Sequence, residues 1–466
     1  MKIGIVGPTY DQRSLPFDAQ RSINLMPIFD RQGKEVASML GTPGLATFAS
    51  IGSQPVRGCF ASSNGRAFVI SGAGLFEVTS SSDVTFRGSL ATASGPITID
   101  ENNNQFFFCD GINGYTFTYG TNAFAQITDP DFPSPGSITF LDSYAIVNEN
   151  GTGRFYISAP NNATSWDALD FATAESSPDR LLRVINAFGQ LFLFGEKTTE
   201  IWTNTGASDF PFARIAGAKM DVGILSPFSA QDIDNQIVWV GRDEFGSGIV
   251  YSATGFTPQR ISTETIERRI NEATDRENIT SWVYQEDGHR FYVLTGGGLE
   301  TSLTYDLTTQ LWHEKSSLDG NGNFAQHLGT CHMFAFGKNL VGSRTTGRLY
   351  EQSLDIFDDD GASLVRERIY THLSDEDRRV RYNVLDLGFE TGVGLQTGYG
   401  EDPQVAMQLS KDGARTYSNW YTTSIGRVGK YKQKVSFRRL GIAEQMTFRI
   451  RTSAPVKISV TGSYLR

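Results

Sequence analysis

One pattern recurs along most of the chain: an aromatic-rich run reaches a glycine or polar turn, and a second short run follows. Seven copies begin at Arg66, Gln105, Tyr144, Gln190, Gln236, His289 and Asn339. Successive starts are 39, 39, 46, 46, 53 and 50 residues apart. A further short strand precedes the copies, such as PVRGCFAS before the first, which gives four strands per unit. Units of this kind and period are typical of propeller blades, so we expect a six- or seven-bladed β-propeller.

The composition supports an all-β fold. The chain of 466 residues contains 48 Gly, 32 Phe and 17 Tyr. Aromatic residues suit a pleated, half-buried surface, and glycine supplies tight turns. A series of β-sandwiches is the alternative, but it explains the regular spacing less well.

The texture of the sequence divides the chain into four parts. Residues 1–50 are expected to form an extended segment that docks on the propeller, and residues 51–355 to form the propeller itself. Residues 356–380 are charged and turn-rich, which indicates an exposed connection. Residues 381–466 contain several alternating runs and predict a C-terminal, sandwich-like β domain.

One segment departs from the strand pattern. Ser262 to Thr274 has Ile266 and Ile270 four residues apart with charges around them. This spacing predicts a short amphipathic helix that packs between blades.

Charge and hydropathy exclude several classes of protein. The net charge is −10, so a general binder of polyanions is not expected. No apolar run reaches about 18 residues, and no signal peptide is recognisable, so we expect no membrane span and synthesis in a cytoplasm. Cys59, Cys109 and Cys331 are too scattered for a disulfide framework and are interpreted as reduced core residues.

The opening stretch MKIGIVGPTY suggests a nucleotide-binding turn but lacks its chemistry. Gly7 is followed by Pro8 and no further glycines, whereas the fingerprint needs three for close approach to pyrophosphate. We expect Lys2–Val6 to add a strand to an existing sheet, with the next segment extended over the propeller.

Other motifs are equally weak as sites. His327, Cys331 and His332 lack a recognised metal spacing, and Asp358–Gly361 lacks the ligand order of a calcium loop. Ser410–Tyr417 resembles an Asp-box, which is a folding turn rather than a catalytic one. We therefore predict no catalytic, cofactor-binding or metal-binding residue and no cofactor.

Basic residues cluster once, in GRVGKYKQKVSFRRLG. The cluster consists of Arg427, Lys430, Lys432, Lys434, Arg438 and Arg439. Lys430, Lys432 and Lys434 alternate, so on a strand they would project to one face. This face could meet DNA or a neighbouring subunit, or it could be a solvated face that discourages edge pairing.

Three stretches resemble the packaged-DNA stabilisation proteins of short-tailed bacteriophages, also described as tail nozzle or tail accessory proteins. They are YDQRSLPFDAQRSINLMPIFD with TPGLATF, the run from SSPDRLLRVINAFGQLFLFGEKTTEIW to ISTETIERRI, and the run from VLDLGFETGVG to SAPVKISVTGS. Together they cover about half of the chain, and none is a catalytic signature.

The resemblance implies a non-enzymatic virion protein in the phage tail, made in the host cytoplasm. Such proteins assemble as a homohexameric ring below the portal and adaptor, extend the DNA channel and retain the packaged double-stranded genome. They also attach a needle, plug, spike or fibre. A propeller that binds or hydrolyses glycans is the alternative, since fold alone does not determine function.

Overall fold

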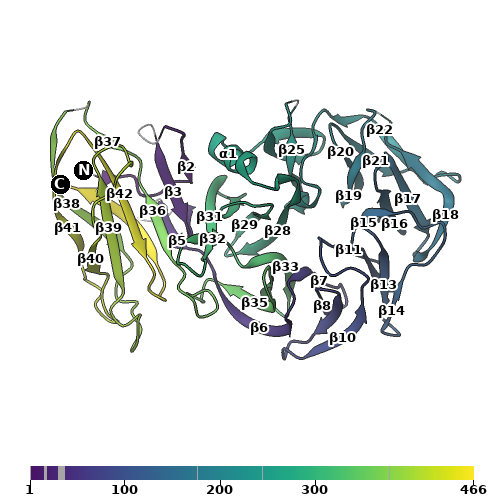
Figure 1. Ribbon diagram of the computed structural model, residues 1–466, viewed down its shortest axis with the longest axis horizontal. Helices are drawn as coiled ribbons and strands as arrows, with labels where there is room; N and C mark the ends of the chain where they lie inside the picture. The colour runs from purple at the N-terminus through teal and green to yellow at the C-terminus, as the bar shows by residue number, and fades with distance from the viewer. Residues whose placement is uncertain (1, 15–17, 30–36, 176, 244, 377) are drawn as a thin grey trace.

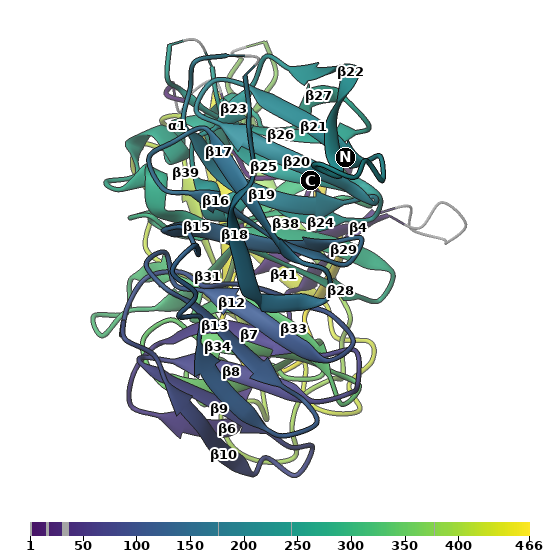
Figure 2. The ribbon, with the colours of Figure 1, turned by 90° about the vertical axis from the view of Figure 1, so that its right-hand side faces the viewer.

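The computed structural model describes residues 2–14, 18–29, 37–175, 177–243, 245–376 and 378–466. It has two β domains in a row: a ring of sheets on the right of Figure 1 and a smaller sandwich on the left. Figure 2 shows the side of the ring that points away from the sandwich, with the C-terminal strands behind the ring. Parts of the N-terminal motif, residues 15–17 and 30, lie outside the described residues.

The ring consists of successive antiparallel units, and the first four of them have four strands in chain order from the inside outwards. The first three are β7 (Val56–Ala61), β8 (Ala67–Ser71), β9 (Gly74–Val78) and β10 (Val84–Ser89); β11 (Thr98–Glu101), β12 (Gln105–Cys109), β13 (Gly114–Thr118) and β14 (Ala123–Gln126); and β15 (Pro135–Leu141), β16 (Tyr144–Glu149), β17 (Arg154–Ala159) and β18 (Asn162–Thr173). The fourth is β19 (Leu181–Ala187), β20 (Gln190–Gly195), β21 (Thr199–Asn204) and β22 (Phe212–Met220).

The next two units carry additions to this plan. The fifth unit is β23 (Gly223–Ile224) and β24 (Gln231–Ile233) beside β25 (Gln236–Arg242), then β26 (Gly248–Thr254) and β27 (Thr257–Arg260), with a 3-10 turn η1 (Pro227–Ser229). The sixth is β28 (Ile279–Glu286), β29 (His289–Gly296), β30 (Ser302–Asp306) and β31 (Leu311–Leu318). Strand β32 (Phe324–Gln326) pairs with β31, and the 3-10 turn η2 (Arg276–Asn278) precedes β28.

The last unit joins two distant parts of the chain. Its strands are β33 (Gly329–Ala335), β34 (Lys338–Ser343), β35 (Gly347–Ser353) and, outermost, β6 (Gly44–Gly52). Strand β6 leads directly into β7, and β33 contacts β7, so the ring closes on itself. Gly347 allows this closure, because a Cβ there would lie 2.3 Å from the Gly52 carbonyl oxygen.

The middle strands are the seven aromatic-rich pairs of the sequence pattern, and they are buried because the units pack face to face. All five residues of Gln105–Cys109 are buried. Phe106 packs against Phe68 of the neighbouring unit, with ring centroids 4.6 Å apart, and against Phe117 at 5.2 Å. Apolar runs without alternation are expected for strands that are covered on both faces. This is the architecture of a β-propeller.

The predicted helix is α1 (Glu264–Glu272). Ile266 and Ile270 are fully buried in an apolar cluster that includes Val238 of the fifth unit and Leu294 of the sixth. The helix therefore packs between neighbouring units, as its spacing indicated.

The C-terminal domain is a sandwich of two sheets. Its strands are β36 (Arg366–Ile369), β37 (Leu373–Ser374), β38 (Val380–Phe389), β39 (Gln404–Ser410), β40 (Tyr421–Ser424), β41 (Val435–Ala443), β42 (Gln445–Thr452) and β43 (Ser459–Leu465). Leu385, Ile425 and Phe448 are fully buried between the sheets. The Asp-box turn lies here, where the Asp412 carboxylate accepts hydrogen bonds from the backbone of Arg415 and Thr416.

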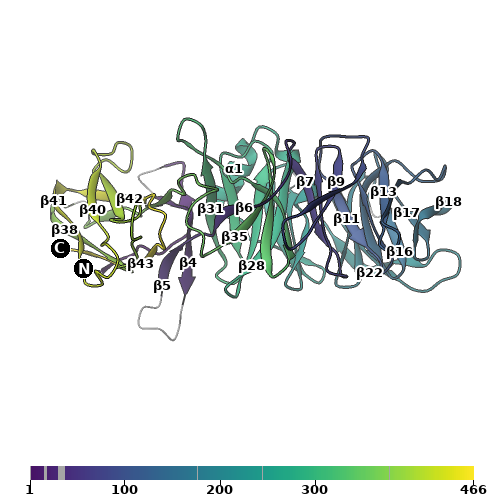
Figure 3. The same ribbon diagram turned by 90° about the horizontal axis from the view of Figure 1, so that it is seen from below.

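The N-terminal segment connects the two domains rather than docking on the propeller alone. Its strands are β1 (Lys2–Ile3), β2 (Tyr10–Asp11), β3 (Ala19–Ile23), β4 (Leu25–Phe29) and β5 (Ala37–Gly41). Strands β1 and β5 pair with β43 of the sandwich, and strands β4 and β5 project from the junction in Figure 3. Strand β3 lies between β31 of the propeller and β36 of the sandwich, so one twelve-stranded sheet crosses the junction. The predicted boundary at residue 50 falls inside β6.

The predicted exposed connection over residues 356–380 needs a correction at β36. Arg366, Glu367 and Arg368 are almost fully buried, at 1%, 1% and 0% exposure. Each residue has partners. Arg366 donates to the carbonyl oxygens of Phe357 and Ala454, Glu367 pairs with two arginines of the sandwich, and Arg368 donates to backbone carbonyl oxygens of the N-terminal segment. Buried charges are tolerated where such partners satisfy them.

Candidate functional site

The six basic side chains singled out in the sequence surround the start of β41, and all six are exposed. The strand begins at Val435, whereas Lys430 and Lys432 lie in or beside turns. The expectation that Lys430, Lys432 and Lys434 share one face of a strand is therefore wrong. Gly429, with φ of 81°, helps to turn the chain here, and alternation applies only within extended backbone.

The last two residues of the cluster, Arg438 and Arg439, are neighbours and yet both are exposed. Consecutive side chains of a regular strand point to opposite faces. The pairing of β41 with β38 shifts register between Tyr382 and Val384, and Arg439 has φ of 64°. This β-bulge places an extra residue on β41 and directs both guanidinium groups to solvent.

Two of the six cations have carboxylate partners. Arg427 Nη1 lies 3.1 Å from Glu401, and Lys434 Nζ lies 3.7 Å from Asp386. Within the part of the chain that the structure describes, the other four make no ion pair: Lys430, Lys432, Arg438 and Arg439. We call the two paired and four unpaired cations together the basic surface. Unpaired cations lose no existing partner when they bind an anionic surface.

Exposed apolar groups lie within the same segment. Tyr431 is 74% exposed and Val428 is 44% exposed. A surface that combines an exposed aromatic ring with unpaired cations is suited to contact with an acidic protein or with phosphate groups. The basic surface is therefore the candidate contact site of the C-terminal domain.

The centre of the propeller contains a different environment. A cavity of about 390 Å³ is lined by the innermost strands, and its charged side chains are Arg57 and Arg183. No carboxylate is among the described residues that line it, whereas a glycosidase needs a pair of them across its substrate. His332 faces this cavity and interacts with Asn339, and His327 is buried. Among the described residues, no group of three or more His, Cys, Asp or Glu side chains could hold a metal ion.

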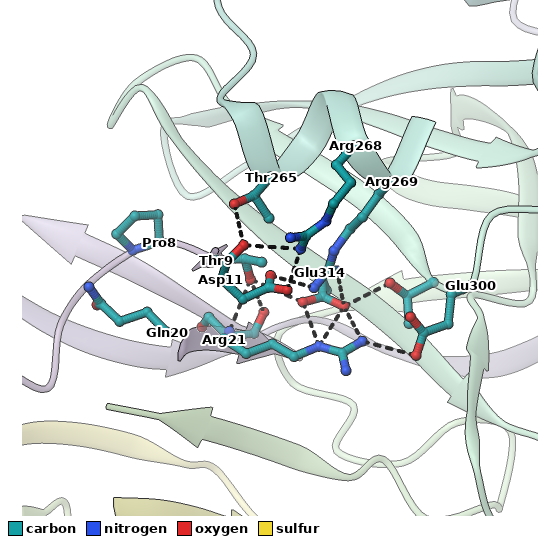
Figure 4. A network of polar contacts seen from close by, with 12 residues as sticks. Pro8, Thr9, Asp11, Gln20, Arg21, Thr265, Arg268, Arg269, Glu300 and Glu314 are labelled. Atoms are coloured by element: carbon teal, nitrogen blue, oxygen red, sulfur yellow. Dashed lines mark hydrogen bonds and ion pairs between the residues drawn. The ribbon is translucent and has the colours of Figure 1, made fainter. Parts of the chain in front are cut away.

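The junction between the domains holds a charge network that the sequence did not reveal (Figure 4). Arg21 of β3 donates to Glu314 of β31 through Nε at 2.9 Å and Nη2 at 2.8 Å. Arg269 of α1 bridges Glu314, at 2.7 Å, and Asp11 of β2, at 2.8 Å. Arg268 donates to Asp11 as well, at 2.7 Å. The network thus ties the N-terminal strands to the propeller.

Glu314 is the centre of this network, and its side chain is fully buried. Thr9 and Thr301 also donate hydrogen bonds to its carboxylate, at 3.2 and 2.8 Å. Burial alone would raise the pKa of Glu314, but Arg21 and Arg269 outweigh it and hold the pKa well below its usual range. The carboxylate therefore stays ionised in the folded protein.

A buried arginine fixes the opening stretch to the sandwich. Arg368, which is fully buried, donates to the carbonyl oxygens of Ile5, at 2.8 Å, and Pro8, at 2.9 Å. A Cβ on Gly7 would lie 2.6 Å from the Arg368 guanidinium. The glycine that suggested a phosphate site thus makes room for an arginine of this chain.

A buried lysine lies inside the sixth unit. Lys315 of β31 is fully buried, and its amine lies over Tyr284, 4.5 Å from the ring centroid. Its amine donates to Gln352 Oε1 at 2.7 Å. Burial lowers the pKa of Lys315 to about 7. A neutral amine costs less to bury than an ammonium ion.

Comparison with solved structures finds proteins of low similarity. They include the extracellular domain of a hybrid two component system from B. thetaiotaomicron (10% identity, TM-score 0.43, 85% of this chain and 48% of that chain) and the N-terminal domain of Nup159 (8%, 0.41, 72% and 98%). This chain thus spans about half the length of the first of these. A computationally designed protein, Ika8, also matches (14%, 0.36, 66% and 99%).

No curated protein matches the sequence, and no described helix is long and apolar enough to cross a membrane. Two family models match it in succession. Residues 1–356 match the model described as "Bacteriophage P22 Gp10, beta-propeller", and residues 366–466 match "Bacteriophage P22 Gp10, beta-sandwich". The all-β fold with a propeller and a C-terminal sandwich is thereby confirmed, and so is the predicted family. The chain belongs to the bacteriophage P22 Gp10 family and is a structural protein of a phage tail.

Proposed function

We propose that the protein forms a ring, a homohexamer, in the tail below the portal and adaptor. There it extends the DNA channel, retains the packaged genome and attaches a needle, plug, spike or fibre, without catalysing a reaction. It is made in the host cytoplasm and acts in the virion. The observation that carries this proposal is the match to both Gp10 models, in order, over nearly the whole chain.

The junction supports a mechanical role. A sheet that continues from β31 through β3 to β36 resists rotation of one domain against the other, because rotation would break backbone hydrogen bonds. The buried Glu314 network adds charge-assisted bonds at the same place. A subunit of a channel needs such stiffness so that its two ends stay at a fixed distance from each other.

The distribution of charge supports different roles for different surfaces of the ring. Each chain carries −10, so six chains would carry about −60, and an acidic channel wall repels DNA and lets it slide. The basic surface is the local exception. We assign it to a contact with DNA phosphates or with an acidic face of the neighbouring subunit.

Assembly tests the ring directly. The purified chain is mixed with a portal–adaptor complex and examined by native mass spectrometry and electron microscopy. Six copies bound below the adaptor are expected. A chain that ignores the complex would refute the proposal; a monomer in isolation is compatible with it, because such a ring can form on its template.

Charge reversal tests the basic surface. The double variant Lys430→Glu with Lys432→Glu should give particles that lose DNA or fail to complete the tail. The matched control is Lys197→Glu with Arg214→Glu, which reverses two exposed cations on the propeller. Normal titre and normal DNA retention in the first variant would exclude this assignment while leaving the ring itself intact.

A further inference from the structure

Two of the three cysteines meet although they are far apart in the chain. Cys59 lies on β7 and Cys331 on β33, 272 residues later, and their sulfur atoms are 2.9 Å apart with a thiol hydrogen bond between them. A disulfide bond is about 2.05 Å long. A shift of about 1 Å therefore brings the two sulfur atoms to bonding distance.

The pair lies where the propeller closes. Strand β7 is the innermost strand of the first unit, and β33 is the innermost strand of the last. The last unit is also held to the start of the ring by the pairing of β35 with β6 and by an apolar cluster that includes Val56 and Leu340. A covalent bond between Cys59 and Cys331 would lock these two units together.

Both thiols are accessible from the central cavity. Cys59 and Cys331 are half-buried and line that cavity of about 390 Å³. Cys109 differs: it is 1% exposed, does not line the cavity and interacts with Thr98. The chain therefore contains its own unpaired reference thiol.

We propose that Cys59 and Cys331 form an intramolecular disulfide when the protein meets a small oxidant such as a peroxide, and that this bond locks the propeller closed. In the first step one thiolate attacks the peroxide, so that a sulfur–oxygen bond forms and the oxygen–oxygen bond breaks. The hydroxide that leaves takes up the proton released by the thiol. In the second step the other sulfur displaces water from the sulfenic acid. In sum, two thiols and one hydrogen peroxide give one disulfide and two waters.

Thiol counting on the full chain tests the proposal. The protein is treated with hydrogen peroxide, freed of oxidant, denatured and titrated with a thiol reagent under conditions that prevent exchange. The number of free thiols should fall from three to one, with a mass loss of two hydrogens. Tryptic digestion should then release two peptides joined by the disulfide. One begins after Arg57 and contains Cys59, and the other begins after Lys315 and contains Cys331.

Single variants separate this bond from other oxidation. Cys59→Ser and Cys331→Ser should each abolish the linked peptide, whereas Cys109→Ser should retain it and end with no free thiol. The oxidised protein should melt about 5 °C or more above the reduced one, and a reducing agent should reverse the shift. Three free thiols after treatment, a loss of a single thiol, or a disulfide-linked dimer on a non-reducing gel would each overturn the proposal.

Discussion

Replacing Glu314 by glutamine tests whether the junction network stabilises the protein. Glutamine keeps the volume of the side chain but removes the charge that Arg21 and Arg269 share. Arg269 keeps Asp11 as a partner. Among the described residues, the ion pair that Arg21 keeps is with Glu300, which is 65% exposed and 3.4 Å away. The change therefore leaves the charge of Arg21, whose side chain is 21% exposed, almost without a compensating carboxylate.

The size of the effect follows from that geometry. Removing one partner of a buried ion pair costs about 3–5 kcal/mol. Arg21 is partly exposed, so we expect the lower end, about 3 kcal/mol of unfolding free energy at pH 7. Urea titrations followed by tryptophan fluorescence measure it. The control is Glu196→Gln, whose partner Arg180 is 62% exposed, and which should cost less than about 1 kcal/mol.

The pH dependence provides a second check. The folded-state pKa of Glu314 lies below the ordinary value of 4.5, so its contribution is fully present above pH 4.5 and is lost as the pH falls through the folded pKa. The difference between the wild type and Glu314→Gln should thus be constant from pH 7 to about 5 and shrink below that. A loss at pH 7 no larger than that of the control would refute the reasoning.

Two further changes examine other buried features. Lys315 should make the unfolding free energy of the wild type rise between pH 7 and 10.5, by at most about 1.4 kcal/mol per pH unit. The reason is that the unfolded lysine, with its ordinary pKa of 10.5, binds more protons in this range than the folded one. Lys315→Met should flatten this rise. Equal slopes of unfolding free energy against pH in the two proteins would contradict this. Gly347→Ala should cost more than about 2 kcal/mol in the same urea assay, since its Cβ would collide with Gly52 at the ring closure. Gly320→Ala, whose Cβ would meet nothing within 4 Å, is the control, and equal losses would show that the closure tolerates the methyl group.

The local parts of the fold could be predicted from the sequence. Each aromatic-rich pair became the two middle strands of a unit, because the signals that define it, continuous apolar runs and glycine turns, lie within about 15 residues of each other. The helix at Glu264–Glu272 followed from its own spacing for the same reason. The exposure of the six basic side chains also followed from their residue type.

The contacts between distant segments could not be predicted. Arg21 and Glu314 are 293 residues apart, and Arg368 and Ile5 are 363 apart, so no local pattern relates them. The charged run at β36 was predicted to be exposed because most of its partners, such as Ala454 and Ile5, come from distant parts of the chain. The bulge at Arg439 was missed as well, since a bulge is defined by the register of the partner strand β38.

The pairing of β1 with β43 has a consequence for synthesis. Ser463 donates a hydrogen bond to the carbonyl oxygen of Ile3, 460 residues earlier in the chain. While a ribosome makes the protein, the first strands emerge long before β31, β36 and β43 exist to cover them. Unpaired strand edges favour aggregation, and contacts of such long range form slowly. We therefore expect newly made chains to depend on chaperones that shield these N-terminal strands until the sandwich is complete.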